Sequence, residues 1–238
     1  PTIAFIGGGN MASAIIGGLI HQGHPASQIE VVEPWAEARE ALRKNYGIEA
    51  QAEAGPALQR AQIVVWAVKP QTFRDAAAQA KAHTQGALHL SVAAGIRSDS
   101  IAQWLGTERI VRTMPNTPAL VGKGMSALYA RPAVSAPERQ SIEAIMATTG
   151  EFLWVDSEPQ LDAVTALSGS GPAYVFYFLE AMTRAGTGMG LTEQQAHQLA
   201  VGTFVGASEL ARRSDDPPSV LRQRVTSKGG TTYAALQS

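Results

Sequence analysis

A glycine-rich turn near the start of the chain carries the residue types best suited to chemistry. Apolar residues 2–6 read as a strand and lead into Gly-Gly-Gly-Asn-Met-Ala at 7–12, followed by apolar residues at helical spacing. In the spacing G-x-G-x-x-A, Gly7 permits a tight turn, Gly9 lets the backbone approach a pyrophosphate, and Ala12 lets the helix pack on the strand. The motif predicts a dinucleotide site at the helix N-terminus, although a strand-turn-helix unit that binds nothing could contain the same glycines.

A carboxylate ends the second predicted strand, residues 30–33. In doubly wound α/β folds this place lies beside the ribose of the cofactor, where Glu33 would accept a hydrogen bond from the 2′-OH of NAD and repel the 2′-phosphate of NADP. The alternative is that Glu33 only caps a strand at the surface. We expect its long side chain to be exposed and able to rotate away, which limits the bias against NADP to about tenfold or less.

Two further strand ends carry residues suited to a ligand. The apolar segment 63–68 is followed by Lys69 and Pro70, and the segment 88–92 is followed by Ala93, Ala94 and Gly95. Open α/β sheets bind ligands at the carboxyl ends of their strands. Lys69 could neutralise cofactor charge, but a solvated lysine at a strand end is an equally simple interpretation. The small residues after position 92 would let a flat ring approach closely.

The C-terminal part contains two more unusual segments. Ser-Gly-Ser-Gly-Pro at 168–172 is costly inside a helix, and such a cost usually marks the close approach of another backbone or a ligand. Gly-Gly-Thr-Thr at 229–232 predicts a helix start whose N–H groups form a nest for an anion, with an ordinary N-cap as the alternative. The five histidines show no metal-binding spacing, and no Ser/His/Asp arrangement stands out, so no metal is expected.

Composition narrows the class of protein. The chain has 238 residues, 45% of them hydrophobic, and a net charge of -1, which excludes disorder throughout and gives no reason to expect nucleic acid or an anionic membrane as a partner. Cysteine is absent, so no disulfide, thiolate nucleophile or cysteine metal site is expected. The longest uncharged run, 163–179, contains glycines and a proline and does not read as a membrane span. No signal peptide precedes the first strand, and we expect a cytoplasmic protein.

The order of predicted elements describes two domains. Up to about residue 156, short apolar strands alternate with helices, as in a parallel α/β sheet. The strands are expected at 2–6, 30–33, 63–68, 88–92, 109–113, 125–130 and 151–155. Beyond 157 only helices are expected, and capping boxes predict helix starts at Ser135, Ser157 and Thr192. We therefore predict an α/β domain over residues 1–156 and an all-α domain over 157–238.

Together these segments resemble the pyrroline-5-carboxylate reductase family, which performs the last step of proline synthesis. The resemblance runs in order through the segments 5–12, 67–71, 93–95, 112–118 and 165–174. Its most diagnostic part is Val-Thr-Ser-Lys-Gly-Gly-Thr-Thr-Tyr-Ala-Ala-Leu at 225–236, which resembles the C-terminal signature of the family. A G-x-G-x-x-A motif alone is shared by many enzymes, whereas these segments in this order are not.

The resemblance implies an α/β Rossmann-type N-terminal domain and an all-α C-terminal dimerisation domain, forming a homodimer or a ring of dimers. It implies NADP or NAD as cofactor, held by Ile6, Gly7, Gly8, Gly9, Asn10, Met11, Ala67, Val68, Lys69, Pro70, Ala93, Ala94 and Gly95. The substrate would bind Gly230, Thr231 and Thr232, with Asp215 as the best match to an acidic residue of the preceding loop. Two departures concern the cofactor: Glu33 replaces a small polar or basic residue, and Ala54 replaces an asparagine that is common in relatives.

The implied reaction is hydride transfer from a reduced nicotinamide to the C=N carbon of the cyclic imine pyrroline-5-carboxylate, giving L-proline. The hydroxyl of Thr232 would reach the ring nitrogen as the catalytic group. One rival is a β-hydroxyacid dehydrogenase, which resembles the chain at its glycine-rich segments but carries a catalytic lysine where this chain has Val175. The other is a dinucleotide sensor without catalysis, which would not need the Gly-Gly-Thr-Thr segment.

Overall fold

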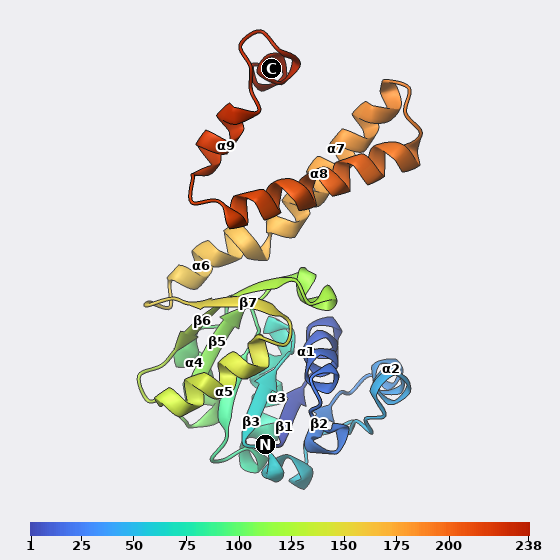
Figure 1. Cartoon of the computed structure of the whole chain (residues 1–238). Coiled ribbons are helices and arrows are strands. Elements are labelled where there is room, and N and C mark those ends of the chain that lie inside the picture. The colour runs from blue at the N-terminus through green and yellow to red at the C-terminus, as the bar shows by residue number, and fades with distance from the viewer. The chain divides into compact units, whose positions relative to one another are not determined.

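The computed structural model describes residues 1–238, which form two compact units, Pro1–Pro172 and Ala173–Ser238. The first unit is built on one seven-stranded sheet with the strand order β2-β1-β3-β4-β5-β6-β7 (Figure 1). Its strands are β1 Ile3–Ile6, β2 Ile29–Val32, β3 Ile63–Trp66, β4 Leu88–Ser91, β5 Ile110–Met114, β6 Gly124–Ala130 and β7 Gly150–Trp154. All seven overlap the segments predicted as strands.

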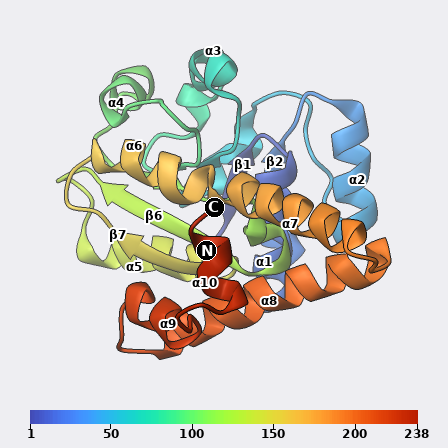
Figure 2. The same ribbon diagram turned by 90° about the horizontal axis from the view of Figure 1, so that it is seen from above.

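The central strands form because their residues are apolar without interruption. Every residue of β1 and β3 is buried, as expected for strands that are covered on both faces. Helices α1 (Asn10–His21) and α5 (Ala136–Met146) pack on one face, and α3 (Pro70–Ala80) and α4 (Ser98–Leu105) pack on the other (Figure 2). The helix α2, Ala36–Tyr46, adds Leu42 to the core on the α1 side. This is the doubly wound arrangement predicted from the alternation of strands and helices.

The sheet is parallel except at one step. Strand β6 runs antiparallel to β5, with Val111 opposite Ala130, whereas the sequence favoured a parallel sheet throughout. The physical reason is the short connection 115–123, because a parallel crossover needs a dozen or more residues, usually a helix. This connection contains only the 3-10 turn Thr117–Val121. Strand β7 is again parallel to β6, since α5 supplies the crossover between them.

Helices alone follow β7, as predicted. They are α6 Gln160–Val164, a π-helical turn Thr165–Gly169, α7 Gly171–Gly188, α8 Glu193–Arg213, α9 Pro218–Arg224 and α10 Thr231–Leu236. The first compact unit ends at Pro172, so α6 and the π-helical turn belong to the unit that contains the sheet. The division of function expected at residues 156–157 stays a prediction.

In the second unit α7 and α8 form a hairpin (Figures 1 and 2). The rings of Phe178 and Phe204 lie 6.1 Å apart, and a Cβ at Gly186 would lie 2.7 Å from that of Ala196. Large apolar side chains nevertheless remain exposed on these helices, among them Tyr177 at 71% and Leu210 at 69%. Exposed apolar surface on this scale marks a face that another chain or molecule covers. No helix in the structure combines the length and hydropathy required to cross a membrane.

Candidate active site

The glycine-rich turn joins β1 to α1, and its first position has no room for a side chain. Gly7 has a φ of 97°, and a Cβ there would lie 2.3 Å from the carbonyl oxygen of Ala67. Its N–H donates to the carbonyl of Val32 at 2.8 Å, so the turn is fixed against the ends of both neighbouring strands. A Cβ at Gly9, by contrast, would meet no atom within 4 Å. The turn therefore leaves the backbone of Gly9 open to a ligand.

Three helices begin beside this turn without a side-chain cap. Their N-cap residues are Gly9 for α1, Trp35 for α2 and Lys69 for α3, and no side chain accepts from the first-turn N–H groups of these helices. Such free N–H groups, together with the positive ends of the helix dipoles, favour an anion. By comparison, α5 and α8 close their own N-termini with the capping boxes that the sequence predicted.

A cavity of about 680 Å³ lies where these helix starts meet, and we call it the glycine-turn cavity. Its volume is within the range of small-molecule sites. Of the residues predicted to hold a cofactor, it brings together Ile6, Gly7, Gly9, Asn10, Met11, Glu33, Ala67, Val68 and Lys69. The lining does not include Gly8, Pro70, Ala93, Ala94 and Gly95, although Val92, the residue before the last three, contributes to it.

Helix α3 supplies lining residues that the sequence analysis missed. Thr72, Asp75, Ala76 and Gln79 face the glycine-turn cavity at the spacing i, i+3, i+4, i+7, which is one face of a helix. This helical spacing directly after a predicted strand was the feature of the sequence that could have identified these lining residues. Trp35, which is 65% exposed, also lines the cavity and directly follows the Glu33-Pro34 pair.

Glu33 is held in place instead of being free to rotate. Its carboxylate accepts a hydrogen bond from the N–H of Gly8 at 2.7 Å and another from the N–H of Trp35 at 2.8 Å. The expectation of an exposed, freely rotating side chain is therefore wrong, because two backbone donors fix the carboxylate at the mouth of the glycine-rich turn. The nearby Arg39 donates from its guanidinium to the backbone carbonyls of Glu33 and Pro34, at 3.0 and 2.7 Å. These hydrogen bonds of Arg39 therefore go to the backbone.

The π-helical turn packs on the loop that follows β5. Asn116 donates from Nδ2 to the carbonyl of Ser168 at 3.1 Å and accepts at Oδ1 from the N–H of Met125 at 2.9 Å. A Cβ at Gly169 would lie 2.7 Å from Cε of Met114. The Ser-Gly-Ser-Gly segment is thus approached closely by a side chain from the end of β5, and not by the backbone or ligand that the sequence predicted. Asn116 lies in the segment 112–118 that carries the family resemblance, but no role was predicted for its side chain.

The residues predicted to hold the substrate lie in the second unit. Gly229 has a φ of 75°, which favours glycine in the turn that precedes α10, whereas a Cβ at Gly230 would lie 2.6 Å from Oγ of Ser227 and would displace that hydroxyl. Gly230 is the N-cap of α10 and provides no side-chain cap, and Thr231 and Thr232 are exposed in the first turn. Asp215 is exposed in the segment between α8 and α9. Their roles remain predictions.

Comparisons with known protein families agree with this geometry and identify the class of protein. Residues 2–95 match the family described as NADP oxidoreductase coenzyme F420-dependent. A Rossmann-type sheet with a glycine-rich turn and a cavity at the carboxyl ends of its strands is the dinucleotide-binding part of such an oxidoreductase. Residues 158–238 match the family described as pyrroline-5-carboxylate reductase dimerisation.

The full-length relatives give the family. The chain is 46% identical over its full length to pyrroline-5-carboxylate reductase of Pseudomonas aeruginosa, covering 88% of that protein, and 42% identical to that of Haemophilus influenzae, with 98% and 87% covered. A solved pyrroline-5-carboxylate reductase from Coxiella burnetii superposes with a TM-score of 0.90 at 37% identity, with 99% and 88% covered. The enzyme from Plasmodium falciparum, solved with NADP bound, superposes with a TM-score of 0.89 at 28% identity, with 99% and 88% covered. The chain belongs to the pyrroline-5-carboxylate reductase family, NAD(P)H-dependent oxidoreductases that catalyse the last step of proline biosynthesis.

Proposed function

We propose that the chain reduces 1-pyrroline-5-carboxylate to L-proline with NADH or NADPH held in the glycine-turn cavity. The observation that carries this proposal is the convergence of three uncapped helix starts on one cavity beside the open backbone of Gly9, in a chain of this family. These groups fit a dinucleotide, because its pyrophosphate needs N–H donors and close backbone approach. When bound, the reduced nicotinamide supplies the hydride that adds to the C=N carbon.

Different residues of the first unit bind different parts of the cofactor. Gly9, Asn10 and Met11 present the N-terminus of α1 to the pyrophosphate, and Glu33 lies where the ribose of the adenosine half is read. Lys69, at the start of α3, is the cationic side chain of the cavity lining. The loop Ala93-Ala94-Gly95 holds the nicotinamide end, a role supported by Val92 in the cavity lining and by the resemblance to the family.

The residues of the second unit bind the substrate. The N–H groups at Gly230, Thr231 and Thr232 receive its carboxylate, which is supported by the absence of a side-chain cap at the start of α10. The hydroxyl of Thr232 donates a hydrogen bond to the ring nitrogen, and the proton that this nitrogen gains as the adjacent carbon gains the hydride comes from solvent, directly or relayed through the hydroxyl. Asp215 contributes from the loop after α8.

The functional unit is a homodimer or a ring of dimers, supported by the match to a dimerisation family and by the exposed apolar side chains of α7 and α8. We propose no nucleic acid and no membrane as partner, because a net charge of -1 attracts neither. A cytoplasmic location stays a prediction. Light scattering at micromolar concentration should give a dimer or a multiple of it, and a stable, active monomer would contradict the proposal.

The deciding experiment follows the near-ultraviolet absorbance of the reduced cofactor with pyrroline-5-carboxylate as substrate, and the reverse reaction with L-proline at high pH. We expect turnover in both directions and none with 3-hydroxy acids, because Val175 stands where the corresponding dehydrogenases carry a lysine. Cofactor binding without turnover in either direction would instead identify a dinucleotide sensor.

A further inference from the structure

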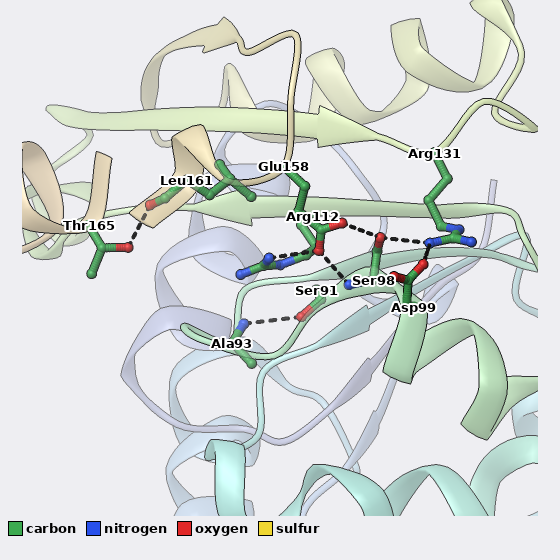
Figure 3. Close-up of polar contacts among 9 residues, drawn as sticks. All are labelled: Ser91, Ala93, Ser98, Asp99, Arg112, Arg131, Glu158, Leu161 and Thr165. Carbon is green, nitrogen blue, oxygen red and sulfur yellow. Dashed lines mark hydrogen bonds and ion pairs between the residues drawn. The ribbon is translucent and has the colours of Figure 1, made fainter. Parts of the chain in front are cut away.

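Glu158 lies between β7 and α6, and its partly buried carboxylate belongs to a polar network of the first unit (Figure 3). Oε1 accepts from the backbone N–H of Ser98 at 2.5 Å and from Nη1 of Arg112 at 2.9 Å, and Oε2 accepts from the Ser98 hydroxyl at 2.6 Å. The side chains of Glu158 and Arg112 are only 12% and 7% exposed. The sequence predicted a capping box at 157–160: the Gln160 side chain does accept from the N–H of Ser157 at 2.9 Å, but α6 begins only at Gln160, with Pro159 as its N-cap. The carboxylate of Glu158, which is not a partner in that box, binds residues far away in the chain.

The carboxylate caps a helix that has no cap of its own. The N-cap residue of α4 is Arg97, whose side chain does not accept from the first turn, and Glu158 takes that place by binding the N–H of Ser98. A negative charge is stabilising at this end of a helix. Burial acts to raise the pKa of Glu158, but the hydrogen bonds from Ser98 and the charge of Arg112 outweigh it and lower the pKa. The group is therefore a carboxylate at neutral pH.

This cap fixes one end of the loop that connects β4 to α4, residues 92–97. At the other end, the N–H of Ala93 donates to the hydroxyl of Ser91 at 3.2 Å. Ser91 and Arg112 are partners in the register of β4 and β5, so both ends of the loop are tied to the same pair of strands. Between these ends Gly95 has a φ of 74° with no atom within 4 Å of its Cβ position. The loop is thus pinned at both ends and open in its middle.

The same carboxylate connects this loop to the segment that carries the π-helical turn. Three residues after Glu158, the buried Leu161 lies in α6, and its carbonyl accepts from the hydroxyl of Thr165 at 2.8 Å. The π-helical turn that begins at Thr165 packs on Met114 and Asn116. Glu158 therefore links the loop after β4, through Ser98, to β5, through Arg112; in the sheet β4 lies next to β3, and β5 next to β4.

We propose that Glu158 is a positioning residue for the reduction: its carboxylate holds the loop 92–97 in the arrangement that presents the nicotinamide for hydride transfer. The inference rests on the proposed function. Glu158 does not line the cavity and acts only through Ser98 and the loop. An amide in its place cannot replace both oxygens: with its oxygen toward the N–H of Ser98 and Arg112, its N–H₂ group faces the Ser98 hydroxyl, which can then no longer donate. The negative charge that pairs with Arg112 is also lost, so this end of the loop is held less tightly.

The test compares Glu158→Gln with Glu138→Gln, using the full chain in its native assembly. Glu138 is a matched control because it also accepts from a backbone N–H at a helix start, that of Ser135, and pairs with an arginine, Arg109, but it lies on α5 and outside the cavity lining. We expect Glu158→Gln to lower kcat about tenfold to hundredfold, because small misplacements at a reacting centre are costly. Glu138→Gln should lower the melting temperature with kcat unchanged.

A kinetic isotope effect separates positioning from mere stability. With deuterium on the transferred position of the reduced cofactor, we expect a larger isotope effect on kcat in Glu158→Gln than in the unchanged chain, because slower hydride transfer then limits turnover. If Glu158→Gln does not fold, Ser98→Ala serves instead: it removes the hydroxyl bond to the carboxylate and the bond that this hydroxyl accepts from Nη1 of Arg131, keeps the backbone N–H bond, and should lower kcat about threefold to tenfold.

The outcomes distinguish this inference from the function on which it rests. An unchanged chain that does not reduce the imine contradicts the proposed function. An active chain in which Glu158→Gln, or Ser98→Ala in its place, turns over as fast as Glu138→Gln with the same isotope effect shows that Glu158 is only structural, and the inference is then wrong.

Discussion

Replacing Glu33 with glutamine should shift the cofactor preference toward NADPH. In the unchanged chain the carboxylate accepts from the N–H groups of Gly8 and Trp35 and lines the glycine-turn cavity, where Asp75 adds a second acidic side chain. Arg39, the basic residue close by, is bonded to backbone carbonyls. A 2′-phosphate would therefore meet negative charge, whereas a 2′-OH can donate to it.

The size of the shift follows from the cost of repulsion and the cost of avoiding it. Two unit charges about 5 Å apart repel by roughly 3 kcal/mol at an effective dielectric of about 20, and physiological salt about halves this. Rotating Glu33 away would break two hydrogen bonds to a charged acceptor, each contributing about 1.5–3 kcal/mol. Because rotating away costs more than the repulsion, about 3–6 against about 1.5 kcal/mol for each unit of phosphate charge, Glu33 stays in place, and we expect a bias of about tenfold to hundredfold against NADPH. The estimate from the sequence alone, which assumed free rotation, was lower.

Isothermal titration calorimetry of NADH and NADPH gives the two dissociation constants directly. In Glu33→Gln the ratio of the NADPH constant to the NADH constant should fall by about tenfold to hundredfold, and NADH itself should bind a few-fold more weakly because one acceptor is lost. Glu37→Gln removes the same charge from the exposed first turn of α2 and should leave the ratio unchanged. An unchanged ratio in Glu33→Gln would refute the reasoning, since it would mean that the carboxylate does not face the 2′ position.

Three further predictions concern the turn, the catalytic group and pH. Gly7→Ala should cost more than about 3 kcal/mol of unfolding free energy, because its Cβ would overlap a backbone carbonyl at a φ of 97°, whereas Gly9→Ala should fold normally and lose cofactor affinity by calorimetry. Thr232→Ala should bind cofactor as before and lose about 1–3 kcal/mol in kcat/KM; unchanged kinetics would remove this hydroxyl from the mechanism. Burial, with a smaller effect from Arg109, lowers the pKa of His89 from 6.5 to about 4. Between pH 4 and 6.5 this imidazole is therefore protonated in the unfolded chain and neutral in the folded chain. Urea unfolding should therefore show a loss of about 3 kcal/mol as pH falls from about 7 to 4. His89→Asn should lose this pH dependence, while the exposed His21→Asn should retain it.

The elements that the sequence predicted are those whose signals are local. Uninterrupted apolar segments predict β1 and β3 because strands buried on both faces contain little else. The capping boxes at Ser135 and Thr192 form as predicted, since both partners of each box lie within three residues. The direction of β6 was missed, although the length of the connection 115–123 contained the answer.

The parts of the site that could not be predicted depend on contacts between distant residues. Glu33 could be placed at the end of a strand, but its donor, the N–H of Gly8, is known only once β1 and β2 are in register. Glu158 was given no role of its own, as the residue after the predicted cap Ser157, whereas its carboxylate binds Ser98, sixty residues away along the chain. A side chain with several nearby donors chooses among them by tertiary geometry, which a local pattern does not contain.

The distribution of helix caps depends both on local sequence signals and on contacts between distant parts of the chain. Helices α5 and α8 begin with residues that satisfy their own N–H groups, and neither start lies at the glycine-turn cavity. At the cavity, α1, α2 and α3 begin with Gly9, Trp35 and Lys69, which cannot accept as Ser, Thr, Asp or Asn would. Those free N–H groups cost little while water reaches them, and they favour an anion that takes the place of that water. The missing caps are therefore readable in the sequence as a pattern, and only the fold shows that three of them converge on one ligand site.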